Sequence, residues 1–152
     1  MAKIKNLPEF ELRNNDGELV NILQLKGNSK LVLYFYPENE SKICTKEACE
    51  FRDHYHNFLE SGAIVVGINK ASPAGLKLFK QKHSLPFTLL SDPDFKIHKL
   101  FGVKNILGFS GRETFLFDEN GKLVYAYNSL LSASKHINNT LNMLKNEKGI
   151  VN

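Results

Sequence analysis

The stretch YFYPENESKICTKEACEFRD, residues 34–53, contains both cysteines of the chain. Cys44 and Cys49 have four residues between them. This spacing is neither the CxxC of a dithiol oxidoreductase nor half of a familiar zinc site. The sequence therefore raises the question of what chemistry a cysteine pair at this spacing supports.

The composition is that of an ordinary globular protein. The chain has 152 residues, which suits one domain with its own hydrophobic core, and 42% of them are hydrophobic. The formal net charge is +4, and the basic residues are scattered among apolar ones. This pattern favours solvated helix faces over a nucleic-acid surface. No repeat or linker stands out, so we expect a single domain spanning residues 1–152.

The lack of a recognisable targeting signal and the low cysteine content predict a cytoplasmic protein. The N-terminal stretch MAKIKNLPEFEL has no apolar run that resembles a signal peptide. No segment approaches the roughly 20 apolar residues of a membrane span. Two cysteines do not make a disulfide scaffold, and in a reducing compartment such a pair is more often reactive or metal-binding than structural.

Apolar runs separated by helical patterns predict an α/β fold. Continuous apolar runs indicate strands buried on both faces at residues 31–37 and 63–69, with a shorter one at 87–92. Residues 114–128 read as two strands around an Asp-Glu-Asn-Gly turn. This order predicts a mixed sheet flanked by helices. A thioredoxin-like arrangement fits it, as do several other α/β folds.

Helical periodicity fills the gaps between these runs. An apolar stripe predicts one helix over residues 44–60. Ser72-Pro73 and Asp92-Pro93 are typical of helix starts, and Gly102 is a plausible helix stop. A final helix carries Ile137, Leu141 and Leu144 on one face.

Cys44 is expected just after a buried strand, in the loop or first turn of the following helix. This edge of an open α/β sheet is the usual place for a functional site. The unpaired N–H groups and partial positive charge of a helix N-terminus favour thiolate, the reactive form of cysteine. Ser41 is the candidate N-cap of this helix.

Cys49 is expected on the same helix as Cys44. Five positions along a regular helix turn a side chain by about 140° and separate the Cα atoms by roughly 8.7 Å. A disulfide requires Cα atoms closer than about 7 Å. The two thiols therefore join only if the first turns of the helix unwind. Such opening would let Cys49 capture a sulfenic acid formed on Cys44.

Two other interpretations of the cysteines remain open on the residues alone. Both cysteines can be small buried hydrophobic residues, as free cysteines often are. A metal site would add His54 and His56, but Cys44 and His56 would lie some 18 Å apart on a continuous helix. That distance is too long for one tetrahedral ion, so we expect no metal site.

Several segments together resemble a known family. These are PEFEL, LVLYFYP, CTKEACEFRD, FTLLSDPD and GRETFLFDENGKLVY, which occur in this order over nearly the whole chain. They resemble peroxiredoxins of the bacterioferritin-comigratory-protein or PrxQ type, which are thiol peroxidases of thioredoxin-like fold. The resemblance therefore implies that fold and a peroxidase activity for this chain.

The resemblance also implies a role for each site residue. Cys44 would be the peroxidatic cysteine and Cys49 the resolving one. Pro37 would shield the thiolate, Ser41 would hold the peroxide through its hydroxyl, and Arg112 would stabilise thiolate and developing negative charge. Backbone N–H groups of Ile43 and Cys44 would add donors, and Glu47 would support the site.

The chain departs from the family pattern beside the nucleophile. It reads SKIC at residues 41–44, where close relatives usually read TPGC. Serine keeps the hydroxyl, whereas Lys42 and Ile43 replace small turn-forming residues. We expect Lys42 to point into solvent. His136 matches a histidine often seen in the last helix, and we expect it on the helix surface.

The resulting hypothesis is an atypical two-cysteine peroxiredoxin that reduces hydrogen peroxide and organic hydroperoxides. An intramolecular Cys44–Cys49 disulfide would be reduced by thioredoxin or a similar dithiol. No cofactor, nucleic acid or membrane is implied, and a monomer is plausible. The alternatives are a peroxide-responsive redox sensor and a non-catalytic thioredoxin-like binding module.

Overall fold

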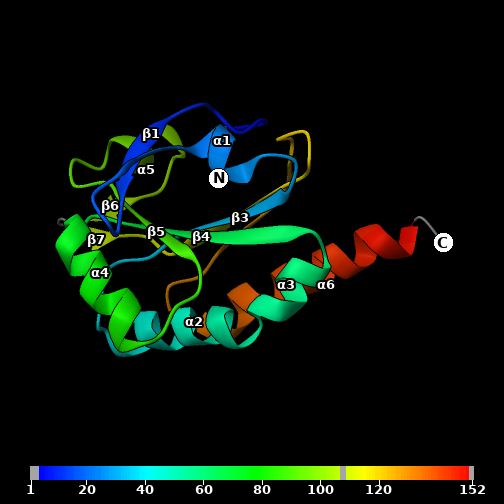
Figure 1. Cartoon of the computed structure of the whole chain (residues 1–152). Helices are drawn as coiled ribbons and strands as arrows, with labels where there is room; N and C mark the ends of the chain where they lie inside the picture. The colour runs from blue at the N-terminus through cyan, green and yellow to red at the C-terminus, as the bar shows by residue number, and fades with distance from the viewer. Residues whose placement is uncertain (1–3, 107–108, 151–152) are drawn as a thin grey trace.

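A mixed sheet forms the centre of the molecule (Figure 1). The computed structural model describes residues 4–106 and 109–150. The sheet has seven strands in the order β2-β1-β5-β4-β3-β8-β9. Their bounds are β1 Glu11–Asn14, β2 Leu19–Asn21, β3 Lys30–Phe35, β4 Ala63–Asn69, β5 Thr88–Ser91, β8 Glu113–Phe117 and β9 Leu123–Asn128. Two short strands, β6 (Asn105–Ile106) and β7 (Phe109–Ser110), pair separately.

Helices cover both faces of the sheet. The helices are α1 Ile22–Lys26, α2 Lys42–Asp53, α3 Tyr55–Glu60, α4 Pro73–Lys82, α5 Lys96–Leu100 and α6 Ala133–Ile150. In Figure 1, α2, α3, α4 and α6 lie below the sheet, whereas α1 and α5 lie above it. Two separate clusters of buried apolar side chains fill the two interfaces. The predicted thioredoxin-like fold with a central mixed sheet is thus confirmed.

The central strand β3 explains the apolar run at its position. It pairs in parallel with β4 and antiparallel with β8, and all of its residues are buried. Alternate side chains point to opposite faces of a strand. Val32 and Tyr34 accordingly belong to the cluster under α2, whereas Leu31 and Phe35 belong to the opposite one. A strand buried on both faces needs a continuous apolar run.

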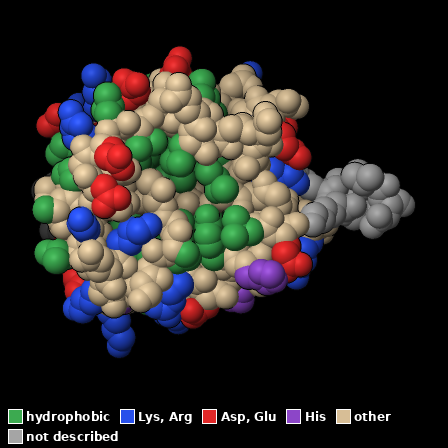
Figure 2. Space-filling view, viewed as in Figure 1, with side chains coloured by type: hydrophobic (Ala, Val, Ile, Leu, Met, Phe, Trp, Pro, Cys, Tyr) green, Lys and Arg blue, Asp and Glu red, His purple; other side chains and the backbone are tan. Residues whose placement is uncertain are grey.

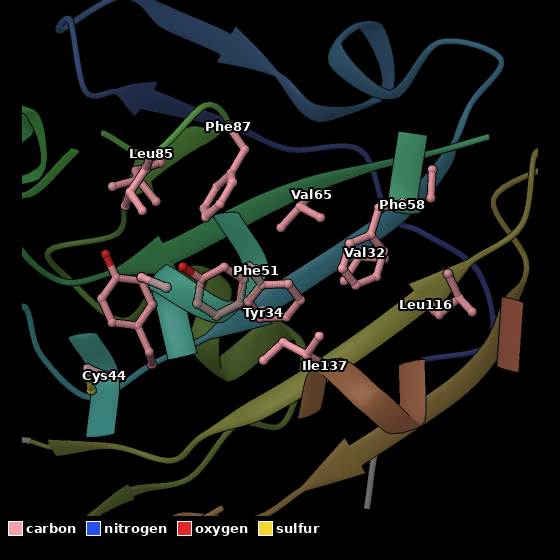
Figure 3. Packing of buried hydrophobic residues seen from close by; sticks show 14 of the residues in the cluster. Val32, Tyr34, Cys44, Phe51, Phe58, Val65, Leu85, Phe87, Leu116 and Ile137 are labelled. Carbon is pink, nitrogen blue, oxygen red and sulfur yellow. The ribbon is translucent and has the colours of Figure 1, made fainter. Parts of the chain in front are cut away.

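Aromatic packing fixes α2 against the sheet. The ring of Phe51 on α2 stacks on Tyr34 of β3 with centroids 4.5 Å apart. Figure 3 shows these two rings side by side, with Phe58, Val65 and Phe87 around them and Cys44 at the edge of the cluster. This packing holds the C-terminal half of α2 against the C-terminal end of β3.

Most sequence predictions of strands and helices are confirmed, with differences at their ends. The run at residues 63–69 is β4, and Ser72 caps α4 through its side chain. The strand predicted at 31–37 ends at Phe35. The helix predicted over 44–60 is divided at His54 into α2 and α3. The apolar stripe continues across this break, since Phe51 and Phe58 pack with ring centroids 5.6 Å apart.

The predicted helix start at Asp92-Pro93 is wrong by several residues, because α5 begins at Lys96. Asp92 nevertheless serves this helix, since its Oδ2 accepts the backbone N–H groups of Ile97 and His98 at 3.0 and 2.9 Å. Asp92 is thus an acceptor at the start of α5, although the first turn of the helix begins four residues after it.

The surface seen in Figure 2 carries charges of both signs. Lys and Arg side chains lie mostly around the edge of this face, with acidic residues between them, and hydrophobic side chains gather near its centre. The basic residues visible here thus form no continuous patch. Among residues 4–106 and 109–150, no helix is long and apolar enough to cross a bilayer.

Candidate active site

The first turn of α2 places Cys44 at the edge of the sheet. Ser41 is the N-cap, in an extended backbone conformation, and its Oγ accepts the backbone N–H of Cys44 at 3.2 Å. This hydrogen bond satisfies one of the free donors of the helix start. Both the predicted cap and the position of Cys44 in the first turn are confirmed.

The thiol of Cys44 is in contact with Arg112. Cys44 is 1% exposed, and Nη2 of Arg112 lies 3.1 Å from its Sγ. Arg112 directly precedes β8, and Glu113 of β8 pairs with Phe35 at the end of β3. This register brings an arginine far along the chain to the cysteine that follows β3. A fixed guanidinium at this distance can donate a hydrogen bond to the sulfur.

Two further acceptors hold the guanidinium in place. Nη1 of Arg112 donates to Oε1 of Glu47 at 2.5 Å, and Nε donates to the carbonyl oxygen of Leu130 at 3.0 Å. Glu47 lies three residues after Cys44 on α2, so both side chains point to the same side of the helix. Arg112 is 2% exposed and is therefore a buried, fully oriented cation.

Glu47 is a buried carboxyl group with an unusual titration. Burial raises its pKa to about 7, although the neighbouring Arg112 acts in the opposite direction. Its Oε2 is buried and makes no hydrogen bond within the described part of the chain. This atom lies 3.7 Å from Nδ1 of His136. Glu47 therefore changes its charge near neutral pH.

His136 forms the next layer behind Glu47. Its Nε2 lies 2.8 Å from the carbonyl oxygen of Ser129, and its Nδ1 lies 2.8 Å from Oγ1 of Thr114. Because a carbonyl oxygen only accepts, Nε2 is assigned the proton and Nδ1 accepts from the threonine hydroxyl. Burial lowers the pKa of His136 to about 4, so the ring is neutral at neutral pH.

The prediction that His136 lies on the helix surface is wrong, because its side chain is fully buried. The signal was present in the sequence. Buried residues of α6 recur at Ala133, His136, Thr140 and Leu144, the spacing of a helix face turned toward the sheet. A histidine within that stripe is directed inward. Thr114, its partner on β8, carried no recognisable signal in the sequence.

The remaining candidate residues lie around this centre. Cys49 is on α2 as predicted, half-buried, and both cysteines are free thiols. Pro37 is half-buried in the loop after β3, and Ile43 is half-buried in the first turn of α2. Lys42 is exposed, as predicted. The structure thus brings Ser41, Cys44, Glu47 and Arg112 into direct contact, with Cys49 further along the same helix.

This arrangement defines a class of protein: a thioredoxin-like domain with a buried, arginine-bound cysteine at a helix start. Comparisons with known proteins agree with it. Residues 5–126 match the AhpC/TSA family. Over 147 residues the chain is 45% identical to chloroplastic peroxiredoxin Q of Oryza sativa subsp. japonica, a match that covers 95% of this chain and 67% of the relative.

The fold is also similar to those of solved peroxiredoxin structures. Peroxidoxin BcpB of Mycobacterium tuberculosis superposes with a TM-score of 0.89 at 31% identity, covering 95% of this chain and 97% of that one. Bacterioferritin comigratory protein of Xanthomonas campestris superposes with a TM-score of 0.82 at 26% identity, covering 95% and 99%. The chain belongs to the AhpC/TSA family. Within it the chain groups with peroxiredoxins of the PrxQ type, and it is a thiol peroxidase.

Proposed function

We propose that Cys44 is the peroxidatic cysteine of an atypical two-cysteine peroxidase and that Cys49 is its resolving cysteine. The observation that carries this assignment is the 3.1 Å contact between Arg112 and the sulfur of Cys44. A thiolate needs a nearby cation, and the departing oxygen of a peroxide needs the same stabilisation. Cys49 has no comparable contact with Arg112 among the described residues, which supports its different role.

In the first step, the Cys44 thiolate attacks the terminal oxygen of the hydroperoxide. A sulfur–oxygen bond forms, the O–O bond breaks, and the departing alkoxide or hydroxide takes up a proton to leave as alcohol or water. Cys44 becomes a sulfenic acid. Arg112 stabilises the charge on the departing oxygen and Glu47 orients Arg112. Pro37 shields the thiolate from water, and the backbone N–H of Ile43 adds a donor.

The hydroxyl group of Ser41 donates a hydrogen bond to the bound peroxide. Its oxygen already accepts the N–H of Cys44, so this N–H is occupied in the resting structure. For the Cys44 N–H to add a donor to the peroxide, it must share or exchange this hydrogen bond. The serine hydrogen stays available, because the cap uses only a lone pair of the oxygen.

In the second step, α2 opens and the Cys49 thiol condenses with the sulfenic acid. A sulfur–sulfur bond forms and water leaves. An external dithiol, thioredoxin or a similar protein, then reduces the disulfide by thiol–disulfide exchange. Because both cysteines belong to one chain, a monomer is sufficient for this cycle. We place the cycle in the cytoplasm.

The proposed substrates are hydrogen peroxide and organic hydroperoxides. The Xanthomonas campestris relative is described as having alkyl peroxide reduction activity. The same substrate class for this chain is our proposal, which the likeness of the two structures supports.

The test is the addition of one equivalent of hydrogen peroxide to reduced wild type, Cys49→Ser and Cys44→Ser. We expect wild type to lose both thiols and the mass of two hydrogens, Cys49→Ser to trap a sulfenic acid, and Cys44→Ser to stay unreacted. Survival of both wild-type thiols for hours would contradict the proposal. A disulfide that forms but is not reduced by thioredoxin would favour the redox sensor instead.

A further inference from the structure

The segment that must open for disulfide formation is bounded by contacts to the end of α4. Cys44 and Cys49 both lie within the intact helix α2, and Cys44 is buried. On a regular helix their Cα atoms are too far apart for a disulfide. The rate of resolution therefore depends on the contacts that keep the first turns of α2 folded.

On its N-terminal side, this segment is held by Glu40. The carboxylate of Glu40 binds two side chains at the C-terminal end of α4, with Oε2 accepting from Nζ of Lys82 and Oε1 lying 2.8 Å from Nε2 of His83. These two hydrogen bonds lower the pKa of Glu40, so it is ionised at neutral pH. The loop before Cys44 is thus tied to α4 by a single side chain.

The backbone of Glu40 is strained in this position. Its φ is +66°, in the left-handed region that residues with a Cβ atom rarely adopt. A strained residue persists only where its surroundings hold it. The Glu40 side chain contacts Lys82 and His83, so releasing these contacts removes part of what holds the loop in this conformation.

On its C-terminal side, the segment is anchored by different contacts. Nη1 of Arg52 donates to the carbonyl oxygen of His83 at 2.7 Å, and Oγ of Ser134 on α6 donates to Glu50 at 2.9 Å. His83 therefore contacts both sides of the cysteine segment, Glu40 through its ring and Arg52 through its backbone. Its ring also packs on Phe79 of α4, with centroids 5.0 Å apart.

We propose that Glu40 is a positioning residue for resolution, a latch whose release from Lys82 and His83 lets the Cys44–Cys49 segment open. This inference rests on the proposed roles of the two cysteines. The latch controls the choice between two fates of the sulfenic acid. Condensation with Cys49 forms the disulfide and releases water. Reaction with a second hydroperoxide forms a sulfinic acid and releases the corresponding alcohol or water.

The two chemical steps are measured separately by rapid mixing. Peroxide attack is followed in the Cys49→Ser background, and disulfide formation is followed in proteins with both cysteines. We expect Glu40→Gln to speed disulfide formation about two- to fivefold, the effect of a partly exposed ion pair. The rate of peroxide attack should stay unchanged. At excess peroxide, the fraction of sulfinic acid should fall.

The matched control is Glu60→Gln on α3. Glu60 also pairs with a histidine, with Oε1 2.7 Å from Nε2 of His56, but it lies outside the cysteine segment. This variant should leave both rates unchanged. Lys82→Gln removes one of the two partners of Glu40 and leaves Glu40 itself unchanged. It should therefore speed disulfide formation less than Glu40→Gln does.

Three outcomes distinguish the possibilities. If Glu40→Gln and Lys82→Gln form the disulfide at the wild-type rate or more slowly, the latch is refuted. If wild type itself forms no disulfide, the proposed function is contradicted, and the rate of disulfide formation cannot be used to test the latch. Amide hydrogen exchange of residues 44–49 then decides on the latch independently, because it should rise in Glu40→Gln and not in Glu60→Gln.

Discussion

Cys44 and Glu47 lie one helical turn apart on α2 and bind the same guanidinium, Cys44 through Nη2 and Glu47 through Nη1 of Arg112. One cation thus serves two acidic groups in a buried site. When both are ionised, they compete for its charge. When Glu47 is protonated, the whole charge is available to the thiolate and to the departing peroxide oxygen.

Arg112→Lys should slow peroxide attack by about 10²- to 10³-fold, the usual cost of losing a fixed donor at a site of developing charge. A single ammonium group cannot contact Cys44, Glu47 and the Leu130 carbonyl at once, whereas the planar guanidinium does so. The rate is measured by stopped flow in the Cys49→Ser background. Arg13→Lys is the control, since Arg13 lies on β1 and its Nη1 donates to the carbonyl oxygen of the nearby Gly17. A loss below fivefold would remove Arg112 from the mechanism.

The charge of Glu47 should appear in the pH dependence of the reaction. Its pKa is raised to about 7, mainly by burial, so the group is neutral below this pH and ionised above it. Ionised Glu47 partly neutralises the positive charge that Arg112 presents to the thiolate and to the departing oxygen. The rate of peroxide attack per thiolate should therefore fall about three- to tenfold as the pH rises through 7, as expected for a change on the order of 1 kcal/mol.

Glu47→Gln is the variant that tests this dependence. Glutamine keeps an oxygen for Arg112 and does not titrate, so the inflection near pH 7 should disappear. The rate is divided by the thiolate fraction, which is measured by ultraviolet absorbance at each pH. An inflection that persists in Glu47→Gln would assign it to another group.

The parts of this site that the sequence predicted depend on local signals. Cys44 follows an apolar run that indicates a buried strand, and Ser41 stands at the spacing of a helix cap. Arg112 was identified through the resemblance alone. Its contact with Cys44 depends on the register between β3 and β8, which no local pattern specifies.

The parts that the sequence did not predict depend on contacts between distant segments. Strand β1 reads ELRN and alternates between exposed and half-buried residues, so it has no apolar run. The raised pKa of Glu47 results from burial among α2, β8 and α6, a property of the assembled fold. The surface prediction for His136 is wrong because a histidine alone fits the polar face of a helix as well as its buried stripe.

Burial of His136 should make the protein less stable in mild acid. Its pKa falls to about 4 in the folded state, against an ordinary value near 6.5, so protonation favours the unfolded state. The stabilising contribution is complete above pH 6.5 and is lost as the pH falls toward 4. Between pH 7 and pH 5 this one group should lower the free energy of unfolding by about 1 to 2 kcal/mol.

The contribution of His136 is isolated by comparing urea unfolding of wild type and His136→Gln at both pH values. The glutamine amide can still donate to the Ser129 carbonyl, so the variant should fold, although less stably at pH 7. Its loss of stability between pH 7 and pH 5 should be smaller than that of wild type. His56→Gln is the control, because the His56 side chain is 82% exposed. An equal loss in His136→Gln and wild type would show that other groups dominate.

Two glycine-to-alanine substitutions should change stability in opposite directions. A Cβ atom on Gly67 of β4 would lie 2.8 Å from Cδ2 of Leu89 and 3.0 Å from the ring of Tyr34, which is itself stacked on Phe51. This ring has no room to move, so Gly67→Ala should lower the free energy of unfolding by about 1 to 3 kcal/mol. Gly75 lies within α4, and a Cβ there would meet its first neighbour at 3.5 Å.

Gly75→Ala should therefore raise the free energy of unfolding by about 0.5 to 1 kcal/mol, because alanine loses less backbone freedom in a helix than glycine does. Urea unfolding at pH 7 measures both changes. The packing under α2 also predicts a functional difference. Gly67→Ala displaces the Tyr34 ring on which α2 rests and should speed disulfide formation, whereas Gly75→Ala should not. If Gly67→Ala is as stable as wild type, the close packing of Tyr34 against β4 is not what holds α2 in place.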